Sequence, residues 1–362
     1  MEHFDGVIVG AGPAGSTAAR FAAKNGLKTL FVDHRKEIGV PVQCGELLPE
    51  CSEITAIFKT VTNLNEFYNV PAEYKELNCK EIVCVSPDGY EISLNFNFFT
   101  VNRVRFDKYL ANLAVKEGAE LRTETHCWKV KNGTLKLNDE YVSAKVIIGA
   151  DGPFSQVARD MNMTLPRELY PAITSSIKGN FPPKAYMYFG SIAPFGYAWI
   201  IPQKKRANVG LGVKYIPKGK TLKGMLFEFI RSKNLDLPDK TTSWVVPMGP
   251  PAETLVKNNV LLAGDAGNHV MAVNGGGIPT GIIAGRDAGI AASLIIQKKK
   301  PVTVYDSLWK MHIYEPLKRA WIMKRRADFF FRGDKRLNFA MKIVGSKRLG
   351  RIIRCKYPFI GR

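Results

Sequence analysis

Long apolar runs are missing from this sequence. No stretch approaches the ~20 consecutive apolar residues that a membrane-spanning helix needs. We also expect no secretory leader, because an apolar strand pattern starts as early as residue 4. We therefore expect a cytoplasmic location, where the six cysteines need not pair.

Metal-ligand patterns are equally scarce. The chain has only five histidines and contains neither a Cys-x-x-Cys pair nor a cluster of His and Cys. We predict no metal site. Internal repeats and low-complexity linkers are absent as well, and 362 residues are enough for a large core divided into two lobes.

Acidic residues are few beside the basic ones, 32 against 52, which leaves a net charge of +20. Most of the excess lies in residues 298–362, with 19 Lys and Arg against 4 Asp and Glu. Aromatic residues such as Trp309, Trp321 and Phe329 are interleaved with these charges, a pattern that favours docking on an anionic membrane surface. Two alternatives stay open. The segment could be a solvated basic helix with its aromatic side packed on the body, or it could bind nucleic acid, which the lack of a nucleic-acid-binding motif disfavours.

Glycine, in contrast, occurs in three motifs with a fixed order. The first is Gly10-Ala11-Gly12-Pro13-Ala14-Gly15, between a strand at 4–9 and a helix at 13–24, with a second strand at 28–32 ending at Asp33. This is the dinucleotide fingerprint in its strand–turn–helix–strand context. Gly10 permits the turn, Gly12 lets a pyrophosphate approach the helix N-terminus, and Gly15 allows close packing. The Asp33 carboxylate is placed to accept hydrogen bonds from ribose hydroxyls.

Two further motifs follow buried strands. Asp151 and Gly152 come after a strand at 145–148, and Gly264-Asp265 comes after a strand at 259–262. Each alone is also explained by an aspartate that caps the next helix. Three glycines at 275–277 then open a helix at 278–297, so that Gly276, Gly277 and Ile278 present its positive end to a cofactor. All three motifs together predict FAD bound in an extended conformation.

At these residues the chain resembles the flavoprotein superfamily with the para-hydroxybenzoate hydroxylase fold. The resemblance implies that Asp265 binds the ribityl chain and that Asp151 lies near the cofactor and helps to hold the fold. It also implies that Arg103, ahead of a helix at 106–116, contacts FAD. A surface ion pair is the alternative for Arg103.

Two more segments narrow the resemblance. They are Pro41-Val42-Gln43-Cys44-Gly45-Glu46 and Gly196-Tyr197-Ala198-Trp199-Ile200-Ile201-Pro202. With the FAD motifs they are similar to the archaeal geranylgeranyl reductase family, over roughly residues 1–330. That family saturates isoprenoid double bonds, notably in digeranylgeranylglycerophospholipids. The sequence departs from it at Ile201, where the family usually has Phe.

The predicted fold is α/β. We assign residues 1–55, 100–165 and 255–298 to a Rossmann-like FAD-binding domain that includes Cys44 and Gly45. Residues 56–99 and 166–254 form a mainly antiparallel substrate-binding domain, with strands expected near 172–178, 185–189, 197–201, 207–213 and 241–246 and a helix at 221–232. Residues 299–362 form a basic helical segment.

Saturating an alkene takes a hydride, which reduced FAD can deliver from N5, and a proton at the adjacent carbon. An isoprenoid offers almost no polar handle, so we expect an apolar tunnel contacted by Tyr188, Tyr197 and Trp199. Ordinary core packing is the alternative for these aromatics. Cys44 is the catalytic candidate. It is interpreted as a proton donor, a redox switch with Cys51, or a packing thiol. His269 is a weaker acid candidate with a structural or cofactor-edge role as its alternative.

The leading hypothesis is thus a reductase acting on an isoprenoid lipid. The alternatives are a hydroxylase or epoxidase of the same fold, and a non-enzymatic membrane or nucleic-acid binder that retains the fold. No second dinucleotide fingerprint is present, so ferredoxin, a quinol and NAD(P)H all remain candidate electron donors.

Overall fold

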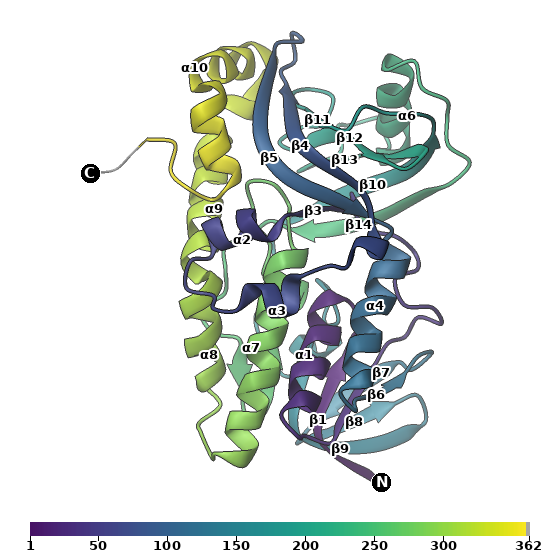
Figure 1. Cartoon of the computed structure of the whole chain (residues 1–362), viewed down its shortest axis with the longest axis vertical. Coiled ribbons are helices and arrows are strands. Elements are labelled where there is room, and N and C mark those ends of the chain that lie inside the picture. Colours follow the sequence, from purple (N-terminus) through teal and green to yellow (C-terminus); the bar gives the residue numbers. More distant parts are fainter. Residues whose placement is uncertain (360–362) are drawn as a thin grey trace.

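A computed structural model describes residues 1–359 of the chain. Two eight-stranded sheets lie one above the other along the long axis of the molecule (Figure 1). The lower sheet has the order β15-β16-β9-β1-β2-β6, extended by β7 and β8 beside β9. Its strands are β1 (Glu2–Val9), β2 (Thr29–Val32), β6 (Glu120–Arg122), β7 (Cys127–Lys131), β8 (Thr134–Leu137), β9 (Glu140–Gly149), β15 (Val256–Lys257) and β16 (Val260–Leu262).

The five central strands of the lower sheet, β16-β9-β1-β2-β6, are parallel, which makes their carboxyl ends share one edge. Helix α1 (Pro13–Lys24) packs between α4 (Arg103–Lys116) and α7 (Ile278–Gln297) on one face of this sheet. Helix α5 (Gln156–Asp160) packs on the β7–β8 side. The predicted helices at 13–24 and 278–297 are confirmed, and the helix predicted at 106–116 begins earlier, at Arg103.

The upper sheet has the order β14-β10-β13-β12-β11-β4-β5-β3. All of its pairings are antiparallel except that of β11 with β4. Its strands are β3 (Leu47–Pro49), β4 (Lys75–Val85), β5 (Glu91–Val101), β10 (Leu169–Lys178), β11 (Ala185–Tyr188), β12 (Tyr197–Gln203), β13 (Arg206–Gly212) and β14 (Thr241–Pro247). The five strands predicted between 172 and 246 are present, with bounds that differ by up to three residues. Strand β3 falls inside the segment 1–55 that we assigned to the Rossmann-like FAD-binding domain, yet it pairs with β5 of the upper sheet.

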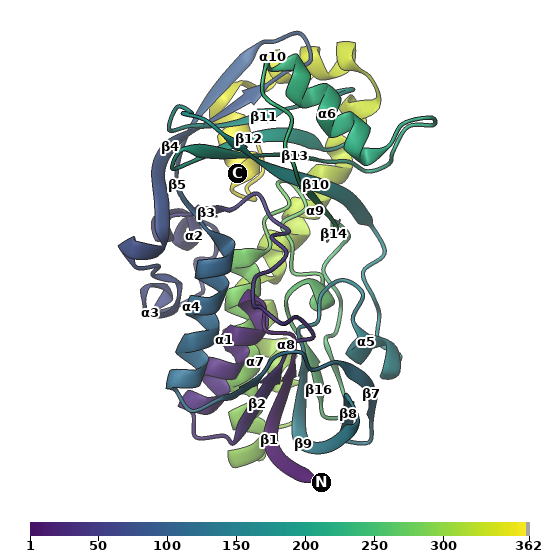
Figure 2. The same cartoon turned by 90° about the vertical axis from the view of Figure 1, so that its right-hand side faces the viewer.

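The upper sheet is covered on both faces. Helix α6 (Leu222–Ser232), capped by the Thr221 hydroxyl, packs Phe229 and its neighbours on the outer face. Helix α10 (Asp334–Ile353) lies over the upper sheet (Figure 2). Its Leu337 and Met341 pack in one cluster with side chains of β5 and β12. Both faces are therefore buried, and aromatic residues occur on each.

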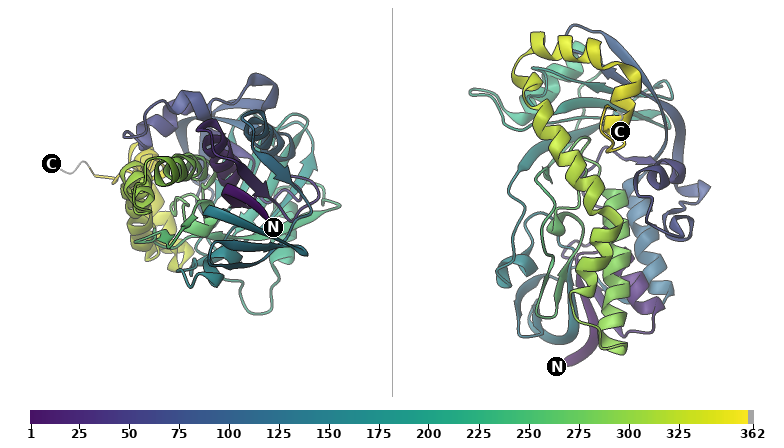
Figure 3. Two further views of the ribbon diagram at one scale, coloured as in Figure 1. Left: turned by 90° about the horizontal axis from the view of Figure 1, so that it is seen from below. Right: turned by 90° about the vertical axis from the view of Figure 1, so that its left-hand side faces the viewer.

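The basic C-terminal segment runs beside both sheets. Helix α8 (Val304–Trp309), the π-helical turn η3 (Lys310–Tyr314) and α9 (Glu315–Ala327) form one rod that climbs from the lower to the upper part (Figure 3, right). Gly345, with a φ of 62°, interrupts the α-helical path of α10. The remaining short elements are α2 (Cys51–Ile57), α3 (Leu64–Tyr68), η1 (Ala72–Tyr74), η2 (Gly264–Gly267) and η4 (Phe330–Arg332). Among residues 1–359 no helix has the length and apolarity to cross a bilayer.

Candidate functional site

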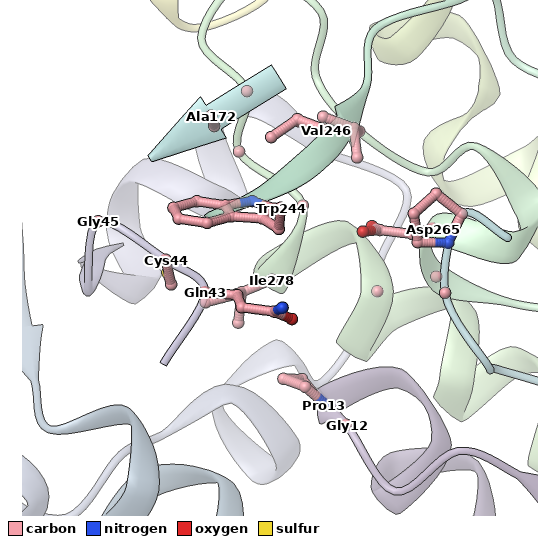
Figure 4. A pocket seen from close by; sticks show the side chains of 18 of the residues that line it. Gly12, Pro13, Gln43, Cys44, Gly45, Ala172, Trp244, Val246, Asp265 and Ile278 are labelled. Atoms are coloured by element: carbon pink, nitrogen blue, oxygen red, sulfur yellow. The ribbon is translucent and has the colours of Figure 1, made fainter. Parts of the chain in front are cut away.

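A cavity of about 850 Å³ lies where the carboxyl edge of the lower sheet meets the inner face of the upper sheet. Figure 4 shows the loop of Gln43 and Cys44 on one side of this cavity and Asp265 opposite, with Trp244 between them. Fifteen of the predicted site residues line it: Gly10, Gly12, Ala14, Asp33, Cys44, Gly45, Arg103, Asp151, Tyr197, Trp199, Gly264, Asp265, Gly276, Gly277 and Ile278. Residues more than 250 positions apart therefore meet in one site.

Gly15 is a predicted cofactor-binding residue that does not reach the cavity. A Cβ atom at this position would lie 1.8 Å from the carbonyl oxygen of Gly10, so only glycine lets α1 approach the turn. Gly10 has a φ of +98°, which also favours glycine. Gly15 thus shapes the loop from behind.

The predicted contact of Tyr188 with the substrate is also wrong, because its side chain faces away from the cavity. Its ring lies 5.2 Å from the ring of Phe229 in α6, on the outer face of the upper sheet. Side chains alternate between faces along a strand, so Met187 and Phe189 line the cavity in its place. Tyr188 is a core residue.

The first glycine loop is held by Asp33. Its carboxylate accepts hydrogen bonds from the backbone N–H of Ala11 at 2.9 Å and of Arg35 at 2.9 Å, and the residue is only 4% exposed. A carboxylate has about four acceptor sites, so lone pairs remain for ribose hydroxyls. Asp33 both fixes the loop and lines the cavity.

Asp151 also has a visible structural task. Its Oδ2 accepts from the backbone N–H of Gln156 at 2.7 Å and of Val157 at 3.2 Å, at the start of α5. Burial raises the pKa of this carboxyl. The helix-capping alternative considered from the sequence therefore holds, at a position that lines the cavity.

Arg103 is the first residue of α4 and does not precede it. Its guanidinium makes two parallel hydrogen bonds to Asp107, at 2.8 and 2.7 Å, and its side chain is 13% exposed. Burial works against its charge, but Asp107 and Cys44 outweigh burial and raise the pKa of Arg103. The ion pair is buried, so the surface-pair alternative is wrong, and a fixed positive charge lies on the cavity wall.

Asp265 lies on the cavity wall opposite the loop of Gln43 and Cys44 (Figure 4). Burial raises the pKa of its carboxyl to about 6, and the opposing charge of Arg103 lowers it only in part. No side chain or backbone group among residues 1–359 donates a hydrogen bond to this carboxylate. Because this carboxylate lines the cavity with its acceptor sites free, the site is suited to a ligand that brings hydroxyl groups.

Cys44 lies in a loop anchored by its neighbour Glu46. The Sγ atom of Cys44 accepts a hydrogen bond from the backbone N–H of Glu46 at 3.1 Å. Glu46, 2% exposed, accepts from the side-chain amides of Gln203 at 2.8 Å and Asn208 at 3.0 Å. The Glu46 carboxylate thereby ties the Cys44 loop to β12 and β13.

Asn208 completes this network. Its Nδ2 donates to the carbonyl oxygen of Cys44 at 2.9 Å, and its Oδ1 accepts from the indole of Trp199 at 2.8 Å. The hydroxyl of Thr174 also donates to Oδ1. All the strong donors and acceptors of this buried amide are used, as is required for a well-ordered polar network. Tyr197 makes a parallel link by donating its hydroxyl to the carbonyl of Asn274, next to the triple glycine.

The two other acid or thiol candidates lie elsewhere. His269 is fully buried, does not line the cavity and has no hydrogen-bond partner on either ring nitrogen among the described residues. Burial lowers its pKa to about 3, so it is no proton donor near neutrality. Cys51 and Cys44 are both free thiols, and Cys51 begins α2 outside the cavity wall. The structure does not pair them.

Sequence reasoning overlooked Glu46, Asn208 and Trp244. Glu46 stood inside the quoted motif, and its place beside Cys44 and Gly45 was a usable signal. Asn208 lies 164 residues from Cys44, and nothing local distinguishes it. Within residues 1–359, no group of three or more His, Cys, Asp or Glu side chains is arranged to hold a metal ion.

Two family models match the chain. Residues 173–249 match the geranylgeranyl reductase catalytic domain, and residues 8–65 match an NAD(P)-binding Rossmann-like domain. The first match contains the upper-sheet strands β11 to β14, which supply Met187, Tyr197, Trp199 and Trp244 to the cavity.

Whole-chain similarities extend over both lobes. Digeranylgeranylglycerophospholipid reductase 2 of Methanococcoides burtonii is 31% identical over 356 residues, covering 89% of this chain and 84% of the relative. The structure of a geranylgeranyl bacteriochlorophyll reductase-like protein from Thermoplasma acidophilum has a TM-score of 0.82 at 27% identity, covering 100% of this chain and 94% of that one. A flavin-dependent brominase has a TM-score of 0.73 at 17% identity, covering 98% and 93%, which shows a shared fold.

Proposed function

This chain belongs to the digeranylgeranylglycerophospholipid reductase family, and we propose that it uses bound FAD to saturate carbon–carbon double bonds of an isoprenoid lipid. The observation that carries the proposal is that the three glycine motifs and an apolar, aromatic wall line one cavity. A hydroxylase would share the fold and the three glycine motifs. The match of the upper sheet to the reductase catalytic domain favours reduction.

The residues present fit FAD. Nothing lies within 4 Å of the position of a Cβ atom at Gly12, so the backbone at the start of α1 is open to a pyrophosphate. Asp33 is available to a ribose and the unbonded carboxylate of Asp265 to the hydroxyls of the ribityl chain. Gly276, Gly277 and Ile278 place the N-terminus of α7 on the cavity wall, where its positive end stabilises negative charge.

Reduced FAD supplies the hydride for this chemistry when it is bound. The chain must orient the alkene, exclude water and deliver a proton to the second carbon. Met187, Phe189 and Trp244 form the apolar wall that would position an isoprenoid chain. Cys44, which we propose as the proton donor, lines the same cavity with its thiol beside the Arg103 guanidinium.

The substrate is an apolar chain carried by a membrane lipid, and we further propose that the protein docks on anionic membrane. Four apolar side chains are exposed in this region: Phe329 just before η4, Phe330 in η4, and Phe339 and Ile343 in α10. Lys335, Arg336 and Lys342 lie among them in the sequence. Apolar side chains interleaved with cations suit reversible binding to a negatively charged interface. The neighbouring Phe331 is 6.1 Å from Phe189, which lines the cavity.

Anaerobic turnover tests the proposed function. The FAD-loaded protein, reduced with dithionite, is incubated with a geranylgeranyl lipid, and the product is measured by mass spectrometry. We expect products that gain pairs of hydrogen atoms without oxygen. Oxygen incorporation with NAD(P)H and air, and no saturation under anaerobic conditions, would assign the hydroxylase alternative. The same assay with ferredoxin, a quinol or NAD(P)H in place of dithionite identifies the electron donor.

A further inference from the structure

A second cavity, of about 570 Å³, shares no lining residue with the candidate site. Its walls are residues 56–60 at the end of α2, the η3–α9 junction, and residues 351–359. Figure 1 shows α2, α9 and the end of α10 near one another on the same side of the molecule. The proposed reaction uses none of them.

Cationic side chains dominate the lining. Lys59, Arg319, Arg351 and Lys356 contribute, and Glu315 is the single carboxylate. His312 also lines the cavity, but its Nδ1 is occupied by Asp287 at 2.7 Å. Within residues 1–359, none of the four cations forms an ion pair. The described lining thus carries an excess of positive charge, with four cations against one carboxylate.

Two guanidinium groups are held in place by backbone contacts. Nε of Arg319 donates to the carbonyl of Cys355 at 3.2 Å, and Nε of Arg351 donates to the carbonyl of Tyr357 at 2.8 Å. Their Nη groups have no acceptor in the described part of the chain. Arg354 differs, since Glu53 holds it through two hydrogen bonds at 2.6 and 2.7 Å. Arg319 and Arg351 are therefore anchored and still have free donors.

The pKa of Lys356 is affected by the same excess of positive charge. Burial lowers the pKa of its ammonium group, the neighbouring cations Lys59, Arg354 and Arg351 lower it further, and Glu53 raises it only in part. Like charges that repel one another are stabilised by an anion placed among them. The exposed rings of Tyr357 and Phe359 at the rim add apolar surface for the organic part of such a ligand.

We propose that this second cavity binds a phosphate group, with Arg319 and Arg351 as its fork-shaped ligands and Lys59 and Lys356 as additional cations. Planar guanidinium groups match phosphate oxygens through paired N–H donors. The phosphate is that of an anionic phospholipid headgroup or of a free phosphomonoester. The site is independent of the proposed reduction and is tested by binding alone.

The experiment is calorimetric titration of the full-length protein at constant ionic strength. The probes are inorganic phosphate, glycerol phosphate and a monomeric short-chain phosphatidylglycerol, which avoids the exposed membrane-docking residues of α10. The double variant Arg319→Gln/Arg351→Gln should bind glycerol phosphate at least about tenfold more weakly, because two charge-assisted contacts are lost. Lys318→Gln, on the same helix but outside the cavity, should bind it as the wild type does.

The probes also distinguish the two sources of phosphate. Tighter binding of phosphatidylglycerol than of glycerol phosphate, lost in the double variant, identifies a lipid headgroup. Binding of glycerol phosphate without phosphatidylglycerol identifies a free phosphomonoester. If the double variant proves unstable, Lys59→Gln, at an exposed position, gives the same comparison. No saturable binding to the wild type, or unchanged binding to a folded variant, overturns the proposal.

Discussion

The side-chain amide of Asn208 donates a hydrogen bond of 2.9 Å to the backbone carbonyl of Cys44. This contact connects β13 of the upper sheet to the loop that carries the proposed proton donor. The same amide group reaches Glu46 at 3.0 Å, so one side chain holds two loop residues. The position of the thiol therefore depends on the upper sheet.

Replacing Asn208 by Ala should destabilise the protein and impair turnover together. Trp199 and Glu46 each lose a buried partner, at a cost of about 1–3 kcal/mol for each group left unsatisfied. Denaturant unfolding and anaerobic alkene reduction measure the two effects. Asn95→Ala, at an exposed strand position, is the matched control and should change neither. Wild-type turnover in Asn208→Ala would show that the loop does not need this anchor.

Cys44→Ala should retain flavin and lose alkene saturation with little change in melting temperature, because the proposed proton donor is removed while the Glu46 contacts that anchor its loop remain. Flavin absorbance, thermal melting and product mass are the measurements. Cys51→Ser, a free thiol outside the cavity wall, is the control and should retain activity. Unchanged turnover in Cys44→Ala would remove Cys44 from the mechanism.

Asp265→Ala should weaken FAD binding, because the proposed hydrogen bonds to the ribityl chain are lost, at a cost on the order of 1–3 kcal/mol. The measurement is the flavin content after gel filtration and the Kd from fluorescence titration. A variant that binds FAD with wild-type affinity contradicts the placement of the ribityl chain.

Asp265 also predicts a pH dependence for the cofactor-free protein. Its folded-state pKa of about 6 lies above the ordinary value of 3.8, so its protonated form is favoured in the fold. This contribution to stability is fully present below 3.8 and is lost as the pH rises through about 6. Asp265→Asn should therefore remove a decline in melting temperature between about pH 4 and pH 6. An identical pH profile in wild type and variant would contradict the assignment.

His269 predicts acid sensitivity of the opposite sign. Its folded-state pKa of about 3 lies below the ordinary 6.5, so stability is complete above 6.5 and falls as the pH drops through that value. One such group changes the free energy of unfolding by roughly 1.4 kcal/mol per pH unit in this window. His269→Leu should flatten the unfolding free energy between pH 6.5 and pH 4, approximately, whereas the exposed His3→Gln should not. Equal slopes in both variants would argue against a neutral buried His269.

Membrane docking is tested better by substituting the exposed phenylalanines than by truncating the chain. A truncation near Lys335 would remove Leu337 and Met341, which are buried against the upper sheet, so it would disturb the core. Replacing the exposed Phe329, Phe330 and Phe339 by Ser leaves that packing intact. Co-sedimentation with anionic vesicles should fall in this variant, and it should fall for the wild type at high salt, where the Debye length is about 3 Å at 1 M. Equal binding to neutral and anionic vesicles would rule out electrostatic docking.

The sequence by itself determined the lower sheet and most of the cofactor wall. Gly10, Asp33 and Asp265 each follow the end of a strand, and parallel strands bring such ends to one edge. The requirement at each position is local: a turn, a close approach or a carboxylate at a strand end. Local requirements of this kind are visible in a short stretch of sequence.

The tertiary structure alone decided the side of the upper sheet on which each aromatic lies. Met187 and Tyr188 are adjacent, yet only Met187 lines the cavity, because both faces of that sheet are buried and the hydrophobic pattern cannot distinguish them. It also decided which distant polar groups meet. Asn208 reaches Cys44 across 164 residues, and Lys59 shares a cavity with Arg351. Such contacts depend on how sheets and helices pack, and no local periodicity carries that information.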